Sequence, residues 1–332
     1  MSRRSSHRVR ILAIASGLIL VALFIWHVGV AALVEQLTRL GPAGLLVLLP
    51  YALGTAISAF PWAQLLTKAR RPSALGTVVS RFAASGANVL VPLMGLAGEP
   101  SRLLWLPRDG RAEGLAAIVI DRLLYNFAGG VVLTSGAAVA FTTILPRLIC
   151  WVAAALGGVL LVMPLLLLGL LSRRGIGKLG RRLLRPRSGG ADPDAAFAAQ
   201  VDAALRRLLA QPPRRLLSAL LLHVGARLVL TLEVYVALWS LHAPASFRDA
   251  VALATVPIAT AFVAFAIPNQ VGVQEGAQAL ICAALGLGPA LGLVLTLLQR
   301  LRQLAFVPLT PFLIALARPE DSAERLAPLP PV

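Results

Sequence analysis

The chain is an almost unbroken succession of long apolar runs separated by short basic loops. A run of about 20 apolar residues can cross a bilayer as a helix, because a helix satisfies its backbone hydrogen bonds within its own segment. Only 14% of the residues are charged and the mean hydropathy is +0.81, whereas about a quarter of a soluble domain is charged. The sequence therefore predicts an all-α, polytopic integral membrane protein built as one membrane domain.

Six runs have the length of a membrane span, and they place the domain at residues 11–317. The first follows a basic N-terminus, residues 1–10, and no signal-peptidase site of the A-x-A type follows it, so we interpret it as an uncleaved span rather than a signal peptide. The polar, proline-rich tail, residues 318–332, is predicted to be disordered. The six runs are Ile11–Val34, Gly44–Leu66, Gly114–Leu145, Leu148–Leu171, Leu216–Leu241 and Leu291–Ala317.

Basic residues are concentrated in the loops and give the chain a formal net charge of +17. Such a charge is compatible with nucleic-acid binding. No nucleic-acid module is present, however, and basic loops are what retention on the cytoplasmic side of a membrane requires. We therefore expect no nucleic-acid partner, both termini in the cytoplasm, and contact of the loops with the anionic lipids of the inner membrane.

One long polar loop, residues 172–215, is rich in arginine and contains an amphipathic pattern. Asp194 is a candidate helix cap, and Phe197, Val201, Leu205 and Leu208 recur at helical spacing beside arginines. The pattern predicts a helix that lies on the inner leaflet. A regulatory docking helix is the alternative.

Two stretches interrupt the apolar pattern in the same way. They are "VPLMGLAGE", which ends at Glu99, and "IPNQVGVQE", which ends at Glu275; in both, a glutamate follows a proline by seven residues, with glycine between. Proline stops a helix and glycine permits a turn. We expect two hairpins, over Ser73–Leu106 and Ala250–Leu287, that either cross the membrane fully or re-enter.

The loop charges place the open end of the first hairpin in the cytoplasm and that of the second outside, which makes an inverted repeat. Interrupted segments in corresponding halves are the sequence feature that best predicts a transporter's binding site. The reason is that non-helical backbone at membrane depth survives only inside protein or beside a wet cavity. Ordinary helix kinks or an interfacial loop are the alternative interpretation.

Charged residues at membrane depth indicate a polar interior. A charge at the centre of a spanning helix costs about 2.5–3.5 kcal/mol on insertion scales, so such residues normally face the bundle interior and are paired. We expect Glu233 and Arg302 to belong to a purely structural salt-bridge network, and Glu99, Arg122, Glu275 and Arg300 to be functional. The full set is Arg81, Glu99, Asp121, Arg122, Arg227, Glu233, Glu275, Arg300 and Arg302.

Cysteine and histidine are too few and too scattered to suggest a cofactor. Cys150 and Cys282 both lie in apolar runs, and the four histidines lack the spacing of metal ligands. We therefore expect no structural disulfide, no metal site and no cofactor.

At these motifs the sequence resembles the flippase-like membrane region of the lysylphosphatidylglycerol synthetases, which are integral inner-membrane proteins. The resemblance rests on "NVLVPLMGLAGE", on Asp121–Arg122, on "IPNQVGVQEG" and on Arg300, in that order, and runs from about Arg10 to Ala317. The pattern "VGVQEG" with "QRLRQL" is most similar to the branch associated with hopanoid biosynthesis. The chain departs from the family pattern at Asn269–Gln270, where glycines are usual, and at Tyr125, where an acid is usual.

The resemblance implies a lipid flippase or exporter, and not the aminoacyl-transferase activity that belongs to the soluble domain of the full synthetases. An intramembrane lipid-modifying transferase and a non-catalytic scaffold for lipid-biosynthesis enzymes are the alternatives. No GxxxxGK[ST] motif is present that would bind ATP, so the possible energy sources are downhill movement of the lipid or coupling to an ion. Together, motif and resemblance suggest as substrate-binding residues Asn88, Pro92, Gly98, Glu99, Asp121, Arg122, Pro268, Asn269, Gly272, Glu275 and Arg300.

Overall fold

The computed structural model describes residues 42–90, 98–174, 193–265, 267 and 270–306, and every regular element among them is helical. In chain order the elements are η1 (Pro42–Val47), α3 (Leu48–Ile57), α4 (Phe60–Leu65), η2 (Lys68–Arg70), α5 (Ala74–Leu90), η3 (Glu99–Trp105), η4 (Arg108–Gly110), α6 (Arg111–Ala140), α7 (Arg147–Arg174), α9 (Pro193–Leu209), α10 (Pro213–Ser240), α11 (Phe247–Val263), α12 (Val273–Ala284) and α13 (Pro289–Phe306). The predicted all-α fold class is confirmed.

Among the described residues, four segments are long and apolar enough to cross a membrane: Gly44–Leu65, Arg108–Ala140, Arg147–Arg173 and Pro213–Ser240. They correspond to four of the six predicted spans. The predicted span Ile11–Val34 lies outside the described residues. The described part of the last predicted span forms α13, which is not one of the four.

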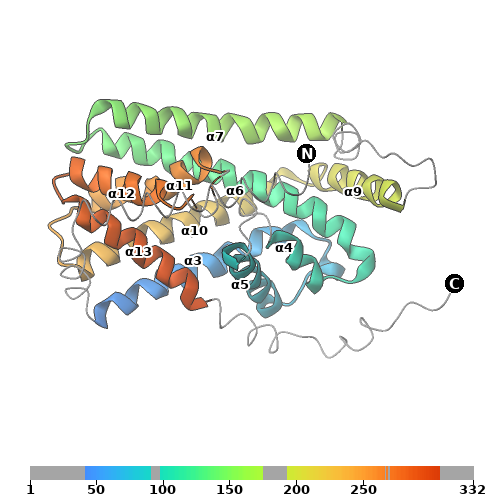
Figure 1. Cartoon of the computed structure of the whole chain (residues 1–332). Helices are drawn as coiled ribbons and strands as arrows, with labels where there is room; N and C mark the ends of the chain where they lie inside the picture. Colours follow the sequence, from blue (N-terminus) through green and yellow to red (C-terminus); the bar gives the residue numbers. More distant parts are fainter. Residues whose placement is uncertain (1–41, 91–97, 175–192, 266, 268–269, 307–332) are drawn as a thin grey trace, which may run out of the picture.

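Helix α6 is the centre of the bundle and α7 is its outer wall. The apolar window of α6 is 61% buried, against 22% for α7. Figure 1 shows α7 running along one side of the molecule, with α6 between it and α10. The outward side chains of α7 include Leu148, Trp151 and Leu166, all exposed. Such a surface suits lipid chains rather than water.

The first described span is broken in the middle. Helix α3 ends at Ile57 and α4 starts at Phe60, with Pro61 in its first turn. Proline cannot donate the backbone hydrogen bond that a continuous helix needs at that position. The break leaves polar groups of Ser58 and Ala59 available to side chains from elsewhere in the bundle.

Two apolar cores mark the two ends of the bundle. One contains the C-terminal part of α10, the start of α7 and the C-terminal end of α6. The other contains the start of α6, the end of α7 and the start of α10. Because the three long helices each run from one core to the other, the cores identify opposite ends of the molecule.

The two hairpins open at opposite ends. The first is α5 followed by η3, which pack together, and Leu106 at its open end belongs to the core at the start of α6. The second is α11 followed by α12, and its open end, with Ala250 and Leu285, belongs to the other core. The inverted arrangement expected from the sequence is therefore present in the fold. The second arms, η3 and α12, have only 7 and 12 residues, too few to span a bilayer of about 20 residues.

The amphipathic pattern in the long loop forms α9, but its apolar face is not available to the leaflet. Val201, Leu205 and Leu208 are buried in the core that also contains the start of α6, and Phe197 remains 41% exposed. Figure 1 shows α9 at that end of the bundle. The expectation that this face lies on the inner leaflet is thus corrected: it packs on protein, because α6 and α7 offer it an apolar surface. Helix α9 begins at Pro193, so Asp194 lies in its first turn and not at the cap position expected for it.

Candidate functional site

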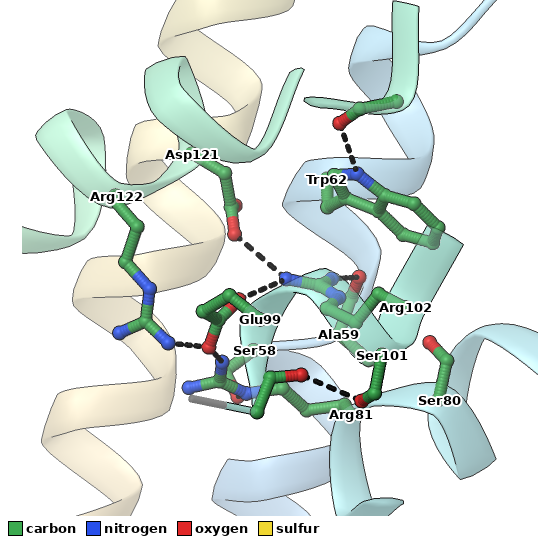
Figure 2. Close-up of polar contacts among 12 residues, drawn as sticks. Ser58, Ala59, Trp62, Ser80, Arg81, Glu99, Ser101, Arg102, Asp121 and Arg122 are labelled. Atoms are coloured by element: carbon green, nitrogen blue, oxygen red, sulfur yellow. Dashed lines mark hydrogen bonds and ion pairs between the residues drawn. The ribbon is translucent and has the colours of Figure 1, made fainter. Parts of the chain in front are cut away.

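Glu99, at the start of η3, is the centre of a buried ion network. Its carboxylate is 2% exposed and accepts from three guanidinium groups. Arg81 Nη1 lies 3.1 Å from Oε1, Arg102 Nη1 lies 3.2 Å from Oε2, and Arg122 also contacts Oε1. Figure 2 shows these side chains converging from α5, η3 and α6. Three guanidinium partners fix the position of this buried carboxylate.

Asp121, the residue before Arg122 in α6, continues the network. Arg102 Nη1 lies 3.0 Å from Oδ2, so this guanidinium bridges Glu99 and Asp121. His223 Nε2, on α10, lies 2.9 Å from Oδ1. Both side chains are almost fully buried. The network therefore ties the first hairpin to two long helices.

The break between α3 and α4 supplies further hydrogen-bond acceptors. Ser58 Oγ accepts from Arg81 Nε at 3.2 Å, and the Ala59 carbonyl accepts from Arg102 Nη2 at 3.3 Å. The Arg102 guanidinium also lies over the ring of Trp62, 4.4 Å from its centroid. Cation–π contact of this kind partly replaces the hydration that a buried arginine loses.

The position of Glu99 depends on the hairpin before it. Gly98 N donates to Asn88 Oδ1 at 2.7 Å, which clamps η3 to α5. A Cβ on Gly98 would lie 1.8 Å from the carbonyl oxygen of Ala84, so no other residue fits there without a shift of the backbone. The sequence motif is therefore explained by close packing of the hairpin. Pro92 lies outside the described residues.

The second hairpin holds its glutamate in a similar way. Glu275 is buried, and its Oε2 accepts from Gly272 N at 2.8 Å across the turn before α12. Gly272 has φ +84°, a conformation that favours glycine. Arg300 Nε, on the following helix α13, lies 2.5 Å from Glu275 Oε1. Pro268 and Asn269 lie outside the described residues.

The predicted residues thus fall into two clusters, one on each hairpin, with a shared design. In each, a glutamate at the start of the second arm is bound by an arginine from the next long helix: Arg122 for Glu99 and Arg300 for Glu275. Arg302 and Glu233, each expected to be structural, form an ion pair with each other. Helix α13 brings the clusters into one unit, since its last residue Phe306 stacks on Phe82 of α5.

Arg102 and His223 are the site residues that sequence reasoning missed. Arg102 lies one turn after Glu99, and a Glu-x-x-Arg spacing is a recognisable pairing signal. His223 and Arg227 are four apart on α10, which puts them on one face. Neither spacing identifies Asp121 as the partner, because that contact joins residues distant in sequence.

Metal and disulfide chemistry have no support among the described residues. No group of three or more His, Cys, Asp or Glu side chains is placed to hold a metal ion within that part of the chain. Cys150 and Cys282 are both free and buried.

These features define a class: a polytopic helical membrane protein whose two opposed hairpins carry buried glutamate–arginine pairs. Residues 10–310 match the family described as the lysylphosphatidylglycerol synthase TM region, and the chain belongs to this family. Comparisons with curated proteins and with solved structures found no match. Membership assigns the chain to the membrane and to a role connected with membrane lipids.

Proposed function

We propose that the protein moves a lipid across the inner membrane, with the lipid headgroup bound between the two hairpins. The substrate is a phospholipid or a hopanoid-type or isoprenoid lipid. Glu99 and Glu275 bind polar groups of the headgroup, and Arg122 and Arg300 balance their charge. Both termini are in the cytoplasm, and the movement is downhill or ion-coupled.

The observation that carries this proposal is the repeated pair on opposed hairpins. Glu99 and Glu275 lie on short arms that enter from opposite ends of the bundle, and each is bound by an arginine of the next helix. Alternating access requires that equivalent elements control access from the two sides. A purely structural ion pair gives no reason for the same arrangement to occur twice in inverted orientation.

The test is transbilayer lipid movement in proteoliposomes, with fluorescent phospholipids and, separately, a labelled hopanoid lipid. Wild type is expected to accelerate movement, and Glu99→Gln, Glu275→Gln and Arg300→Ala are expected to lose the acceleration. Glu113→Gln is the matched control, since Glu113 is a buried glutamate bound by Arg70 outside both hairpin clusters. Mutants as active as wild type would overturn the proposal.

The Asp121–His223 pair is the observation that favours a lipid-modifying transferase instead. A carboxylate that orients an imidazole is a common acid–base arrangement. This alternative predicts chemical turnover of a lipid, measured by mass spectrometry of lipids extracted from the proteoliposomes. A scaffold for lipid-biosynthesis enzymes predicts neither movement nor turnover, together with tolerance of both hairpin substitutions.

A further inference from the structure

Arg227 is a buried cation whose guanidinium is only partly hydrogen-bonded. It lies on α10 and is 8% exposed, and its Nε has no hydrogen-bond partner. Its Nη2 donates to the Tyr125 carbonyl at 3.2 Å, and its guanidinium lies 4.0 Å from the centroid of the Tyr125 ring. Within the part of the chain that the structure describes, no carboxylate forms an ion pair with it.

The neighbouring carboxylates bind other cations instead. Glu99 binds three arginines through its two oxygens. Asp121 binds Arg102 through one oxygen and His223 through the other.

Around Tyr125 the described residues therefore contain an excess of positive charge. Four guanidinium groups, from Arg81, Arg102, Arg122 and Arg227, accompany only the two carboxylates of Glu99 and Asp121. A buried charge without a partner is costly, and an anion bound among these guanidinium groups would remove that cost.

Three of these guanidinium groups surround one ring. Arg227, Arg122 and Arg81 lie 4.0, 5.5 and 5.9 Å from the Tyr125 centroid. The Nε of Arg122, like that of Arg227, is buried without a partner. The Arg122 side chain nevertheless keeps 22% of its exposure, so this arginine is not sealed inside the protein.

Gly129 leaves the space that Arg227 needs. A Cβ there would lie 3.0 Å from Arg227 Nη2 and 3.3 Å from Cζ. The guanidinium is thus packed closely between α6 and the Tyr125 ring, which orients its planar fork. A planar, oriented fork recognises the oxygens of a phosphate in two-point fashion.

We propose that Arg227, with Arg122 and Arg81 around Tyr125, binds a phosphate monoester. An excess of two positive charges matches a monoester, which carries about −1.5 to −2 near neutral pH, better than a diester, which carries one negative charge. This inference deepens the proposed function and rests on it for the identity of the site. Binding, however, is measured without any transport.

The experiment measures binding to the purified full chain in nanodiscs of phosphatidylcholine. The probes are phosphatidic acid, a lipid monoester; phosphatidylglycerol, a lipid diester; and glycerol 3-phosphate and inorganic phosphate, which are free phosphates. Wild type is expected to bind phosphatidic acid more tightly than phosphatidylglycerol, and Arg227→Gln to weaken that binding by at least about 10-fold. Arg206→Gln, an exposed arginine on α9, is the matched control and keeps wild-type affinity.

The free phosphates identify the source of the ligand. Binding of glycerol 3-phosphate as tight as that of phosphatidic acid supports a free phosphate ester, and binding of the lipid alone supports a headgroup. Equal affinity of wild type for the monoester and the diester, or unchanged affinity of Arg227→Gln, overturns the inference.

Two further measurements separate this inference from failed folding and from the proposed function. Without ligand, Arg227→Gln is expected to unfold at a temperature equal to or above that of wild type, because an unbalanced buried charge is gone. Phosphatidic acid is expected to raise the unfolding temperature of wild type and not of the variant. Monoester binding without lipid movement refutes only the transport proposal, whereas movement that persists without such binding refutes only this inference.

Discussion

Arg102 is the residue on which the first cluster depends. It is fully buried, and its one guanidinium connects Glu99, Asp121 and the Ala59 carbonyl at the break between α3 and α4. Removing one member of a buried ion network leaves the others with uncompensated charge, which costs more than the network contributes in net stability.

Arg102→Gln is therefore expected to destabilise the protein by about 3–5 kcal/mol, because Glu99 and Asp121 lose their shared cation. The measurement is denaturant unfolding of the purified protein in detergent. Arg206→Gln provides the control for a change of one charge on an exposed surface. Unfolding of Arg102→Gln at the wild-type midpoint would show that the network is not structural.

For single residues, the sequence predicted which charged side chains lie at membrane depth but not which residues they contact. Glu99, Arg122, Glu275 and Arg300 stand out because charges at membrane depth are rare. The contact of His223 with Asp121 joins residues 102 apart in the sequence, and only the fold brings them together.

Among the elements, the first hairpin is the most constrained. Its turn into η3 has no room for a side chain at Gly98, because the Ala84 carbonyl lies where the Cβ would be. Asn88 then fixes the Gly98 amide, and the ion network begins at the next residue.

Gly98→Ala is expected to displace η3 and with it Glu99, and so to abolish lipid movement in proteoliposomes. Gly158→Ala in α7 is the matched control, since a Cβ there has open space within 4 Å. Transport by Gly98→Ala at the wild-type rate would mean that the position of Glu99 does not matter for function.

Helix α9 shows why an amphipathic pattern does not identify what its apolar face contacts. The spacing of Val201, Leu205 and Leu208 is the same whether the face meets lipid or protein. The structure resolves the choice in favour of protein.

Leu205→Ala is accordingly expected to destabilise the protein by about 2–5 kcal/mol, as for a core leucine. Phe197→Ala on the same helix, at a 41% exposed position, is expected to have a much smaller effect. The measurement is thermal or denaturant unfolding in detergent. Equal, small effects of both substitutions, together with liposome binding by an isolated α9 peptide that Leu205→Ala abolishes, would favour contact with the leaflet.

For the whole molecule, the central feature is the opposed entry of the two hairpins. The sequence predicted it from two short motifs and the distribution of basic loops, and the two end cores of the bundle agree. The sequence could not predict that the break between α3 and α4 is part of the site. A proline within a span does not indicate which groups the freed backbone will bind.

Cysteine labelling tests this arrangement in intact cells. In a background without Cys150 and Cys282, Ala74→Cys at the open end of the first hairpin and Arg248→Cys at that of the second are both at exposed positions. An impermeant reagent added outside is expected to label residue 248 only, and residue 74 only after the membrane is permeabilised. Labelling of both from one side would contradict an inverted repeat.

The claim that the two hairpins form one transport site is tested most directly by a double-mutant comparison of lipid movement. Rates are measured in proteoliposomes for wild type, Glu99→Gln, Glu275→Gln and the double variant, with unfolding temperatures to confirm equal folding. If both glutamates act in one cycle, each substitution slows movement by a similar factor, and the double variant is no slower than the slower single one. Independent effects that multiply in the double variant, or full activity of either single variant, would contradict the account.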